Sequence, residues 1–412
     1  MVSIIILGIV FLLIAVRRIG NLKLKIWQIM SLGAIAVLVS GQISPLAALK
    51  AINPDVMFFL FGMFVVGEAL ESSGYLSYLS YKIFRKAHSL DLLVLAILFV
   101  MGLLSAFLMN DTLAIIGTPV VLLLAHKANT TPKILMLSLA FAITIGSVMS
   151  PIGNPQNLLI AINGGVKNPF VTFFRYLLLP TVINLFIAYL FLRLFYRRHF
   201  NHQPVHHEPE PIKDPKLANL SRISLILLVV LVVVKIALVF LGVEIDFRLT
   251  YIALAAASPL IIFSPKRFNI LREIDWFTLI FFAAMFILME SVWNSGIFQS
   301  FIDKTSFDLT SNVMVMAVSV VLSQFISNVP LVALYLPMLM EMGVSVEGLM
   351  ALAAGSTIAG NLTILGAASN VIIIQNAEKK SGQTLTFVEF VIIGAPLTIV
   401  NVLVYWLFFT IL

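Results

Sequence analysis

The chain of 412 residues contains no cysteine and few charged residues. The absence of cysteine excludes disulfide bonds and thiolate metal sites. Only 11% of the residues are charged, whereas soluble proteins carry about a quarter. All six histidines lie outside the apolar stretches, and no HExxH, GxSxG or P-loop motif occurs. The sequence therefore does not favour an enzyme, and it offers no ATP site as an energy source.

Apolar residues are what the chain has in abundance, at 60% of its length, and the mean hydropathy is +1.06. Stretches near the roughly 20 residues that cross a bilayer as a helix recur along the whole chain. The first stretch runs directly into Arg17 and Arg18 without a small-residue cleavage site, so we expect a retained helix and not a signal peptide. We predict an all-α integral membrane protein in which the lipid bilayer surrounds many crossings.

An internal duplication runs through this apolar sequence. Three blocks of the first half return in the second half, at offsets of 222, 218 and 213: Phe64–Leu76 as Phe286–Phe298, Ser105–Pro119 as Ser323–Pro337, and Thr144–Asn157 as Thr357–Asn370. The order and the spacing of the blocks persist as well as their residues. A duplicated membrane protein with polar interruptions at equivalent points is typical of secondary transporters.

Lysine and arginine positions predict the topology. Segments 90–125 and 311–341 each carry a polar tip near the middle and are too long for one straight crossing, so we expect re-entrant hairpins. With five crossings in each half besides the hairpin, 20 of the 26 basic residues lie inside and 5 outside, as the positive-inside rule requires. Five is an odd number, so the two halves would be inverted relative to each other.

The predicted organisation is a first inverted repeat at 1–198, a linker at 199–220 and a second inverted repeat at 221–412. We expect an inner cell membrane, both termini outside and a cytoplasmic linker. The net charge of +7 then orients the protein, and no nucleic-acid partner is needed to explain it. The linker histidines could bind a metal, but a solvated linker is the simpler interpretation.

Each half also contains a helix that breaks at membrane depth, within 133–163 and 347–378. Irregular backbone is tolerated in the hydrocarbon region only where it faces protein or water. Helix N-termini at such breaks suit an anion, while Asn, Ser and Thr oxygens can coordinate Na⁺. The alternative is that these residues only cap helices. We predict a substrate site at the tips and breaks, formed by Asn110, Thr112, Gly153, Asn154, Asn157, Ser327, Asn328, Gly366, Ser369 and Asn370.

Asp111 is the one carboxylate within a break, and its counterpart in the second half is Val329. A charged residue at the bilayer centre costs about 2.5–3.5 kcal/mol on insertion scales, so it is rarely kept without a use. We expect Asp111, with Asn110 and Asn328, to bind a coupling ion, Na⁺ or H⁺, and we expect no other cofactor or metal. The alternative is a cap for a helix that begins at Leu113. The roles of Glu68, Glu290 and Lys235 stay open.

Four motifs make the chain resemble the ion transporter superfamily, which comprises arsenite permeases, NhaD-type sodium–proton antiporters, citrate carriers and dicarboxylate carriers. They are Met109-Asn110-Asp111-Thr112, Ser327-Asn328-Val329-Pro330, the Gly-Asn-Pro-Gln-Asn run at 153–157, and Gly366-Ala367-Ala368-Ser369-Asn370. The resemblance covers nearly the full length. It implies a mobile transport domain that slides like an elevator against a scaffold, often within a homodimer.

The hairpin tips also separate the branches of this superfamily. Dicarboxylate carriers have Ser-Asn-Thr at both tips, whereas this chain has Asn-Asp-Thr and Ser-Asn-Val. The resemblance therefore favours the arsenite-permease-like branch, and it implies an ion-coupled permease for a small anion or oxyanion-like solute such as arsenite or a carboxylate. Without cysteine, arsenite could be held only through its hydroxyls. A sodium–proton antiporter and a gated ion channel on the same scaffold stay open as alternatives.

Overall fold

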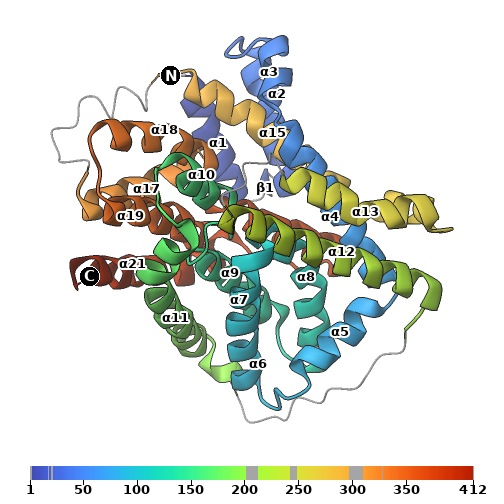
Figure 1. The fold of residues 1–412 in the computed structure, drawn as a ribbon. Helices are drawn as coiled ribbons and strands as arrows, with labels where there is room; N and C mark the ends of the chain where they lie inside the picture. Colours follow the sequence, from blue (N-terminus) through green and yellow to red (C-terminus); the bar gives the residue numbers. More distant parts are fainter. Residues whose placement is uncertain are drawn as a thin grey trace.

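Helices form most of the described part of the computed structural model, which confirms the all-α prediction (Figure 1). The structure describes residues 2–16, 18–19, 22–200, 212–241, 248–296, 310–326 and 328–411. Within them the one strand pairing is antiparallel and only two residues long on each side, between β1 (Arg18–Ile19) and β2 (Leu22–Lys23).

The described part of the first half contains eleven helices. A π-helical turn, Ile97–Met101, joins the sixth to the seventh. The helices are α1 (Val2–Val16), α2 (Ile26–Val39), α3 (Pro45–Ala51), α4 (Pro54–Ser72), α5 (Tyr75–Phe84), α6 (Leu90–Ala96), α7 (Gly102–Leu108), α8 (Asn110–Lys127), α9 (Pro132–Ser147), α10 (Pro155–Asn163) and α11 (Pro169–Phe195).

The described part of the second half follows a short 3-10 turn at Arg197–His199 and repeats this order. Its helices are α12 (Pro215–Phe240), α13 (Leu249–Phe263), α14 (Arg267–Glu273), α15 (Trp276–Trp293), α17 (Asn312–Ile326), α18 (Asn328–Glu341), α19 (Val346–Ile358), α20 (Ala368–Ser381) and α21 (Phe387–Ile411). Two 3-10 turns, Ala359–Asn361 and Ile364–Gly366, lie between α19 and α20.

Five of the described helices are long and apolar enough to cross a membrane, and a sixth crossing results if the bent pair α3 and α4, at 53°, counts as one. The five are Leu90–Leu108, Pro169–Phe195, Pro215–Lys235, Trp276–Trp293 and Phe387–Ile411. Leu90–Leu108 is the first arm of a segment for which we predict a re-entrant hairpin. Its length would also allow a crossing, so the return to the same side stays a prediction.

Helices of each half pack against helices of the other half. Helix α2 of the first half packs against α15 of the second, and α13 of the second half packs against α4 of the first (Figure 1). Helices α3 and α14, which the sequence did not predict, are both seven residues long and lie at the offset of 222. This reciprocal pairing is what a two-fold relation between the halves would produce. The boundaries of the repeats stay predictions.

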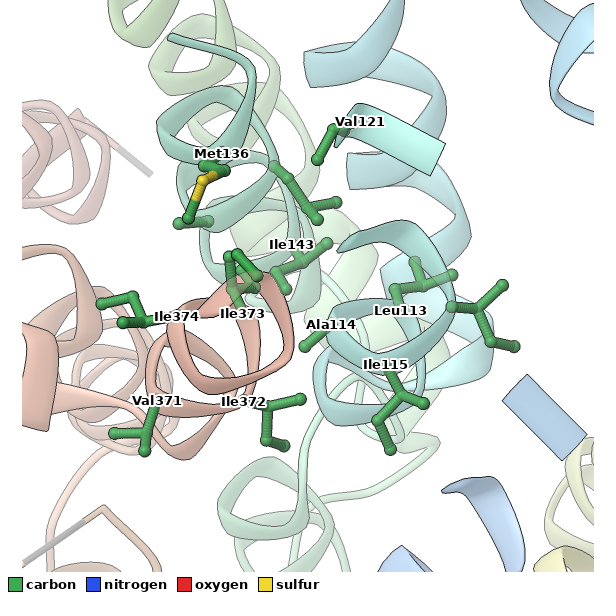
Figure 2. Packing of buried hydrophobic residues seen from close by; sticks show 14 of the residues in the cluster. Leu113, Ala114, Ile115, Val121, Met136, Ile143, Val371, Ile372, Ile373 and Ile374 are labelled. Carbon is green, nitrogen blue, oxygen red and sulfur yellow. The ribbon is translucent and has the colours of Figure 1, made fainter. Parts of the chain in front are cut away.

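The broken helices are held in an apolar core. On α20, Ile373 lies toward Ile143 of α9, and Ile372 lies toward Ala114 of α8 (Figure 2). Without a hydrophobic force between helices in lipid, small residues that allow close approach are favoured. Helices α7 and α9 show this, because a Cβ atom on Gly146 would lie 2.1 Å from the carbonyl oxygen of Gly102.

The predicted linker needs a correction at its end. Helix α12 begins at Pro215, so residues 215–220 are helical; residues 201–211 lie outside the described part. Asp214 explains the early start, because its Oδ1 accepts a hydrogen bond from the Leu217 N–H at 3.0 Å, and proline suits the first helical position. The hydrogen bond and ion pair with Lys266, at 2.7 Å, hold the pKa of Asp214 below its usual range.

Ion pairs lie at the helix ends. Among the described residues these pairs are Lys133–Glu389, Arg193–Asp91, Arg248–Asp55, Lys266–Asp214, and Lys380 with both Glu68 and Glu71. Each joins two residues that the distribution of basic residues assigns to the same side. The orientation of the chain in the membrane stays a prediction.

Candidate functional site

The tip of the first hairpin is a strained turn that contacts the first broken helix. Met109 separates α7 from α8 with φ 65° and ψ 148°. This conformation is costly for any residue except glycine, and such strain is concentrated at functional sites. The next residue, Asn110, donates its backbone N–H to the carbonyl oxygen of Gly153 at 3.1 Å. The tip and the break are therefore joined directly.

The first break runs from Ser147, the end of α9, to Asn154, the cap of α10. The side-chain Oδ1 of Asn154 accepts the N–H of Asn157 at 2.8 Å. The Nδ2 of Asn157 donates to three carbonyl oxygens of the break, those of Ser147 and Val148 at 3.2 Å and of Ser150 at 3.0 Å. One amide thus satisfies several backbone acceptors that the interrupted helix leaves open.

The second break repeats this arrangement at the matched residue. Asn370 Nδ2 donates to the carbonyl oxygens of Gly360 at 2.6 Å and Thr363 at 3.4 Å. At the offset of 213 these acceptors correspond to Ser147 and Ser150. The asparagines that the sequence paired therefore hold equivalent turns.

Both breaks also require glycine. A Cβ atom on Gly153 would lie 2.2 Å from the Ser147 carbonyl oxygen, and one on Gly366 would lie 2.4 Å from the Ala359 carbonyl oxygen. Neither position leaves room for a side chain, because the approaching atoms belong to the backbone and cannot turn away.

The two breaks meet across the halves. Asn154 Nδ2 donates to the Oγ1 of Thr357 at 3.1 Å, and the same hydroxyl donates to Asn157 Oδ1 at 3.2 Å. Thr357 lies in the last turn of α19, immediately before the second break. Its counterpart Thr144 approaches the second break reciprocally, with its methyl group 3.1 Å from a Cβ atom placed on Gly360.

The second hairpin is joined to its break by a residue that we did not predict. Gln324 of α17 donates from Nε2 to the carbonyl oxygen of Ala359 at 3.0 Å, and its Oε1 accepts the hydroxyl of Thr363 at 2.7 Å. The counterpart of Gln324 is Ala106, so the repeat gave no signal for it. The predicted site residue Ser327 lies outside the described residues, whereas Asn328 is buried at the start of α18.

Three of the predicted site residues in the second half carry a buried oxygen that finds no hydrogen-bond partner among the described residues: Asn328 Oδ1, Ser369 Oγ and Asn370 Oδ1. In the first half the amide oxygens are satisfied. Asn110 Oδ1 accepts the Asp111 N–H at 2.9 Å, and Asn157 Oδ1 accepts the Thr357 hydroxyl. A buried acceptor without a partner costs about 1–3 kcal/mol, so these three oxygens are suited to a cation or to a donor on a ligand.

Asp111 lies half-buried in the first turn of α8, beside the buried Thr112. The capping alternative was wrong, because the helix begins at Asn110 and not at Leu113. No described residue makes an ion pair or a hydrogen bond with the Asp111 carboxylate. Its position in the first turn of α8 places the carboxylate at the helix end whose dipole favours negative charge.

A chain of three asparagines ties the second break to the last helix of each half. Asn361 Nδ2 donates to Asn401 Oδ1 at 3.2 Å, and Asn401 Nδ2 donates to Asn184 Oδ1 at 2.9 Å. We missed these residues. A signal was present, because Thr181 and Asn184 recur as Thr398 and Asn401 at one offset of 217. Glu68, Glu290 and Lys235, whose roles the sequence left open, have no described contact with either break.

Comparison with known proteins also indicates a transporter. The citrate transporter family matches residues 9–348. A Mycobacterium tuberculosis protein described as an uncharacterized transporter is 28% identical over 85% of this chain and 84% of its own length. A Dictyostelium discoideum protein named as the transporter arsB is 22% identical over 90% of this chain and 85% of its own length.

Among solved structures, the YdaH transporter of Alcanivorax borkumensis, described as having an unusual topology, aligns over 99% of this chain and 96% of its own. Its TM-score is 0.47 and its identity is 15%. The resemblance to the ion transporter superfamily is confirmed by the family match and by the named relatives. This multi-pass membrane chain is a transporter that belongs to the citrate transporter family.

Proposed function

We propose that this protein is an ion-coupled secondary active transporter of a small anion or oxyanion-like solute, either a carboxylate or arsenite. One observation carries the proposal. The two broken helices of the duplicated halves meet through Asn154, Asn157 and Thr357, at the point where the first hairpin tip also contacts its break. Broken helices that meet in this way at membrane depth form the binding sites of many secondary transporters.

The chemistry of this site suits an anion held by neutral donors. The N-termini of α8 and α10 come together through the Asn110–Gly153 hydrogen bond, and each presents the positive end of a helix dipole. None of the predicted substrate residues is basic. The family description names citrate, which favours a carboxylate, and the relative named arsB keeps arsenite in the set of solutes to test.

A coupling cation follows from the charge of the same site. When Asp111 is ionised, its charge has the same sign as that of a carboxylate solute, and no described ion pair compensates the Asp111 carboxylate. A proton on Asp111, or Na⁺ near it, would neutralise this charge at a depth where charge is costly. The unpartnered oxygens of Asn328 and Asn370 are the hard ligands that Na⁺ prefers.

Alternating access would then occur by an elevator-type movement within a homodimer of the inner membrane. We define the transport domain as α7–α10 and α17–α20, and the scaffold as α2, α4, α13 and α15. Hydrogen bonds from Gln324, Asn110 and Asn154 join hairpins and breaks within the transport domain, so these parts would move as one body. The scaffold is joined separately through the α2–α15 and α4–α13 contacts.

The test is uptake into proteoliposomes under imposed Na⁺ and pH gradients, with citrate, smaller carboxylates and arsenite as solutes. We expect accumulation of at least one anion that depends on a cation gradient. Proton movement driven by Na⁺ without any anion would support a sodium–proton antiporter and would overturn the anion proposal. Unitary currents in planar bilayers would overturn the carrier mechanism, because an elevator cannot conduct at channel rates.

A further inference from the structure

The transport domain contacts the scaffold through charged residues at one end of the molecule. The Nζ atom of Lys380, in the last turn of α20, lies 2.6 Å from Glu68 Oε2 and 3.0 Å from Glu71 Oε2. Both glutamates belong to α4. The neighbouring lysine, Lys379, donates to the carbonyl oxygens of Glu273 and of Ile274, the latter at 2.9 Å. Glu68 is only 9% exposed, so the contact is largely enclosed.

These residues line a pocket with walls from both parts. Ile115 and Pro119 of α8 and Asn376 of α20 form the wall on the transport domain, and Asn376 donates to the Ile115 carbonyl oxygen at 3.2 Å. Phe64, Gly67 and the two glutamates of α4 form the opposite wall. Gly67 allows this approach, because a Cβ atom there would lie 2.9 Å from a methyl group of Ile115.

A matching pocket lies at the symmetric position, but no described residue of the scaffold lines it. At the offsets of the repeat, Ile115, Pro119 and Asn376 correspond to Ala333, Pro337 and Asn163. Those three residues line a second pocket, whose other lining residues are Leu159, Leu336 and Met340. All six belong to α10 and α18, and no residue of α15 contributes, although α15 is the counterpart of α4.

The charged residues of the first pocket also have counterparts. At the offset of 213, Lys380 corresponds to Lys167, just after α10. At the offset of 222, Glu68 corresponds to Glu290 on α15. Lys167 is exposed and has no ion pair among the described residues. Among the described residues, the Glu290 carboxylate accepts a hydrogen bond from Asn294 alone, at 3.2 Å. The repeat thus supplies the residues of a second contact, which this conformation leaves apart.

A duplicated chain whose halves adopt different conformations has a second arrangement available, in which the halves exchange conformations. In that arrangement the α10–α18 junction would pack against α15, as α20 and α8 pack against α4 here. Met289 replaces Gly67 at the contact, and its flexible thioether can adapt to the approaching Ala333.

We propose that Lys167 and Glu290 form an ion pair that positions the transport domain against the scaffold in the opposite-facing state, as Lys380 and Glu68 do in this one. This inference rests on the proposed alternating access. The two contacts are unequal, because Glu71 has Trp293 as its counterpart. Lys167 would therefore meet one carboxylate where Lys380 meets two, and the conformation described here would be the more populated without solute.

Cysteine cross-linking tests the pair directly, since the natural chain has no cysteine. The first variant carries Lys380→Cys with Glu68→Cys, and the second carries Lys167→Cys with Glu290→Cys. A matched control carries Arg248→Cys with Asp55→Cys, which joins α13 to α4 within the scaffold. Each variant is treated in proteoliposomes with a short, cleavable bifunctional maleimide, and uptake is measured before and after cleavage.

We expect all three pairs to cross-link. Uptake should be lost in the first two variants and restored by cleavage, and it should persist in the cross-linked control. A charge exchange gives a second readout: Glu290→Lys should lower uptake, and adding Lys167→Glu should restore it. An exposed lysine without a partner would not give such rescue.

Failure of the inference is distinguishable from failure of the proposed function. If the protein accumulates solute and the Lys380→Cys, Glu68→Cys pair cross-links while the Lys167→Cys, Glu290→Cys pair never does, the second contact is overturned and transport stands. In a variant that carries all four of these cysteines, simultaneous formation of both cross-links in one molecule would also overturn it. If no solute accumulates, the function fails, while the cross-linking still reports whether the second contact forms.

Discussion

The side-chain Nδ2 of Asn154 lies 3.1 Å from the hydroxyl oxygen of Thr357, a residue 203 positions away in the other half of the chain. This hydrogen bond joins two helix breaks, each of which would be unfavourable in hydrocarbon if it stood alone. Because Thr357 also donates to Asn157, one hydroxyl connects both asparagines of the first break to the second half. The contact at the centre of the proposed site is therefore also what holds the two breaks together.

Replacement of Thr357 by valine should destabilise the protein and lower uptake. The change keeps the shape of the side chain but leaves the amides of Asn154 and Asn157 with fewer partners, at a cost of about 1–3 kcal/mol. Thermal unfolding in detergent measures the loss. Thr144→Val is the matched control, because the Thr144 hydroxyl is buried and has no hydrogen-bond partner among the residues that the structure describes, so its removal should cost little. Equal effects of the two variants would contradict the assigned role of Thr357.

Replacement of Gly153 by alanine should destabilise the protein strongly, although the alanine side chain is small. Its Cβ atom would lie 2.2 Å from the Ser147 carbonyl oxygen, so the break must open, and overpacking of this kind costs about 1–3 kcal/mol or more. Gly8→Ala is the control, since nothing lies within 4 Å of a Cβ atom there. We expect a lower melting temperature and reduced uptake for Gly153→Ala alone. Normal uptake by that variant would show that the turn is not needed in this form.

Substitution of Asn401 by leucine should weaken the connection between the second break and the terminal helices. It leaves Asn361 and Asn184, both fully buried, without the amide that joins them. The cost of about 1–3 kcal/mol for each unsatisfied group would appear as a lower melting temperature. Combining it with Asn184→Leu should recover part of the loss, since a pair of apolar residues leaves fewer unpaired groups. A double variant as unstable as the sum of both singles would contradict the chain of hydrogen bonds.

Much of the site could be predicted from the sequence, because the two copies of the repeat can be compared with each other. The matching of Asn157 with Asn370 predicted two positions that hold equivalent turns, and Gly153 and Gly366 occupy equivalent tight contacts. Residues that act through tertiary contact were missed. Gln324 has no counterpart to compare, and the pairing of Lys380 with Glu68 depends on how the two parts pack.

Two predictions about where helices begin were wrong, because single residues at the boundary determine where each helix starts. Asp111 was offered as a cap for a helix at Leu113, yet the strained backbone of Met109 lets α8 begin at Asn110. The predicted linker ran to residue 220, but Asp214 and Pro215 together begin α12 earlier. In both places one residue at the boundary moved the end of the helix, which hydropathy along the chain does not show.

The coupling role of Asp111 is tested most directly by gradient-driven accumulation of the transported anion in proteoliposomes, compared between the natural chain, Asp111→Asn and the control Glu341→Gln, an exposed carboxylate at the end of α18. We expect the natural chain and the control to accumulate the anion when a Na⁺ or proton gradient is imposed. We expect Asp111→Asn to fold normally and to lose that dependence, because asparagine can neither take up a proton nor neutralise a cation. Unchanged gradient-driven accumulation by Asp111→Asn would contradict the account.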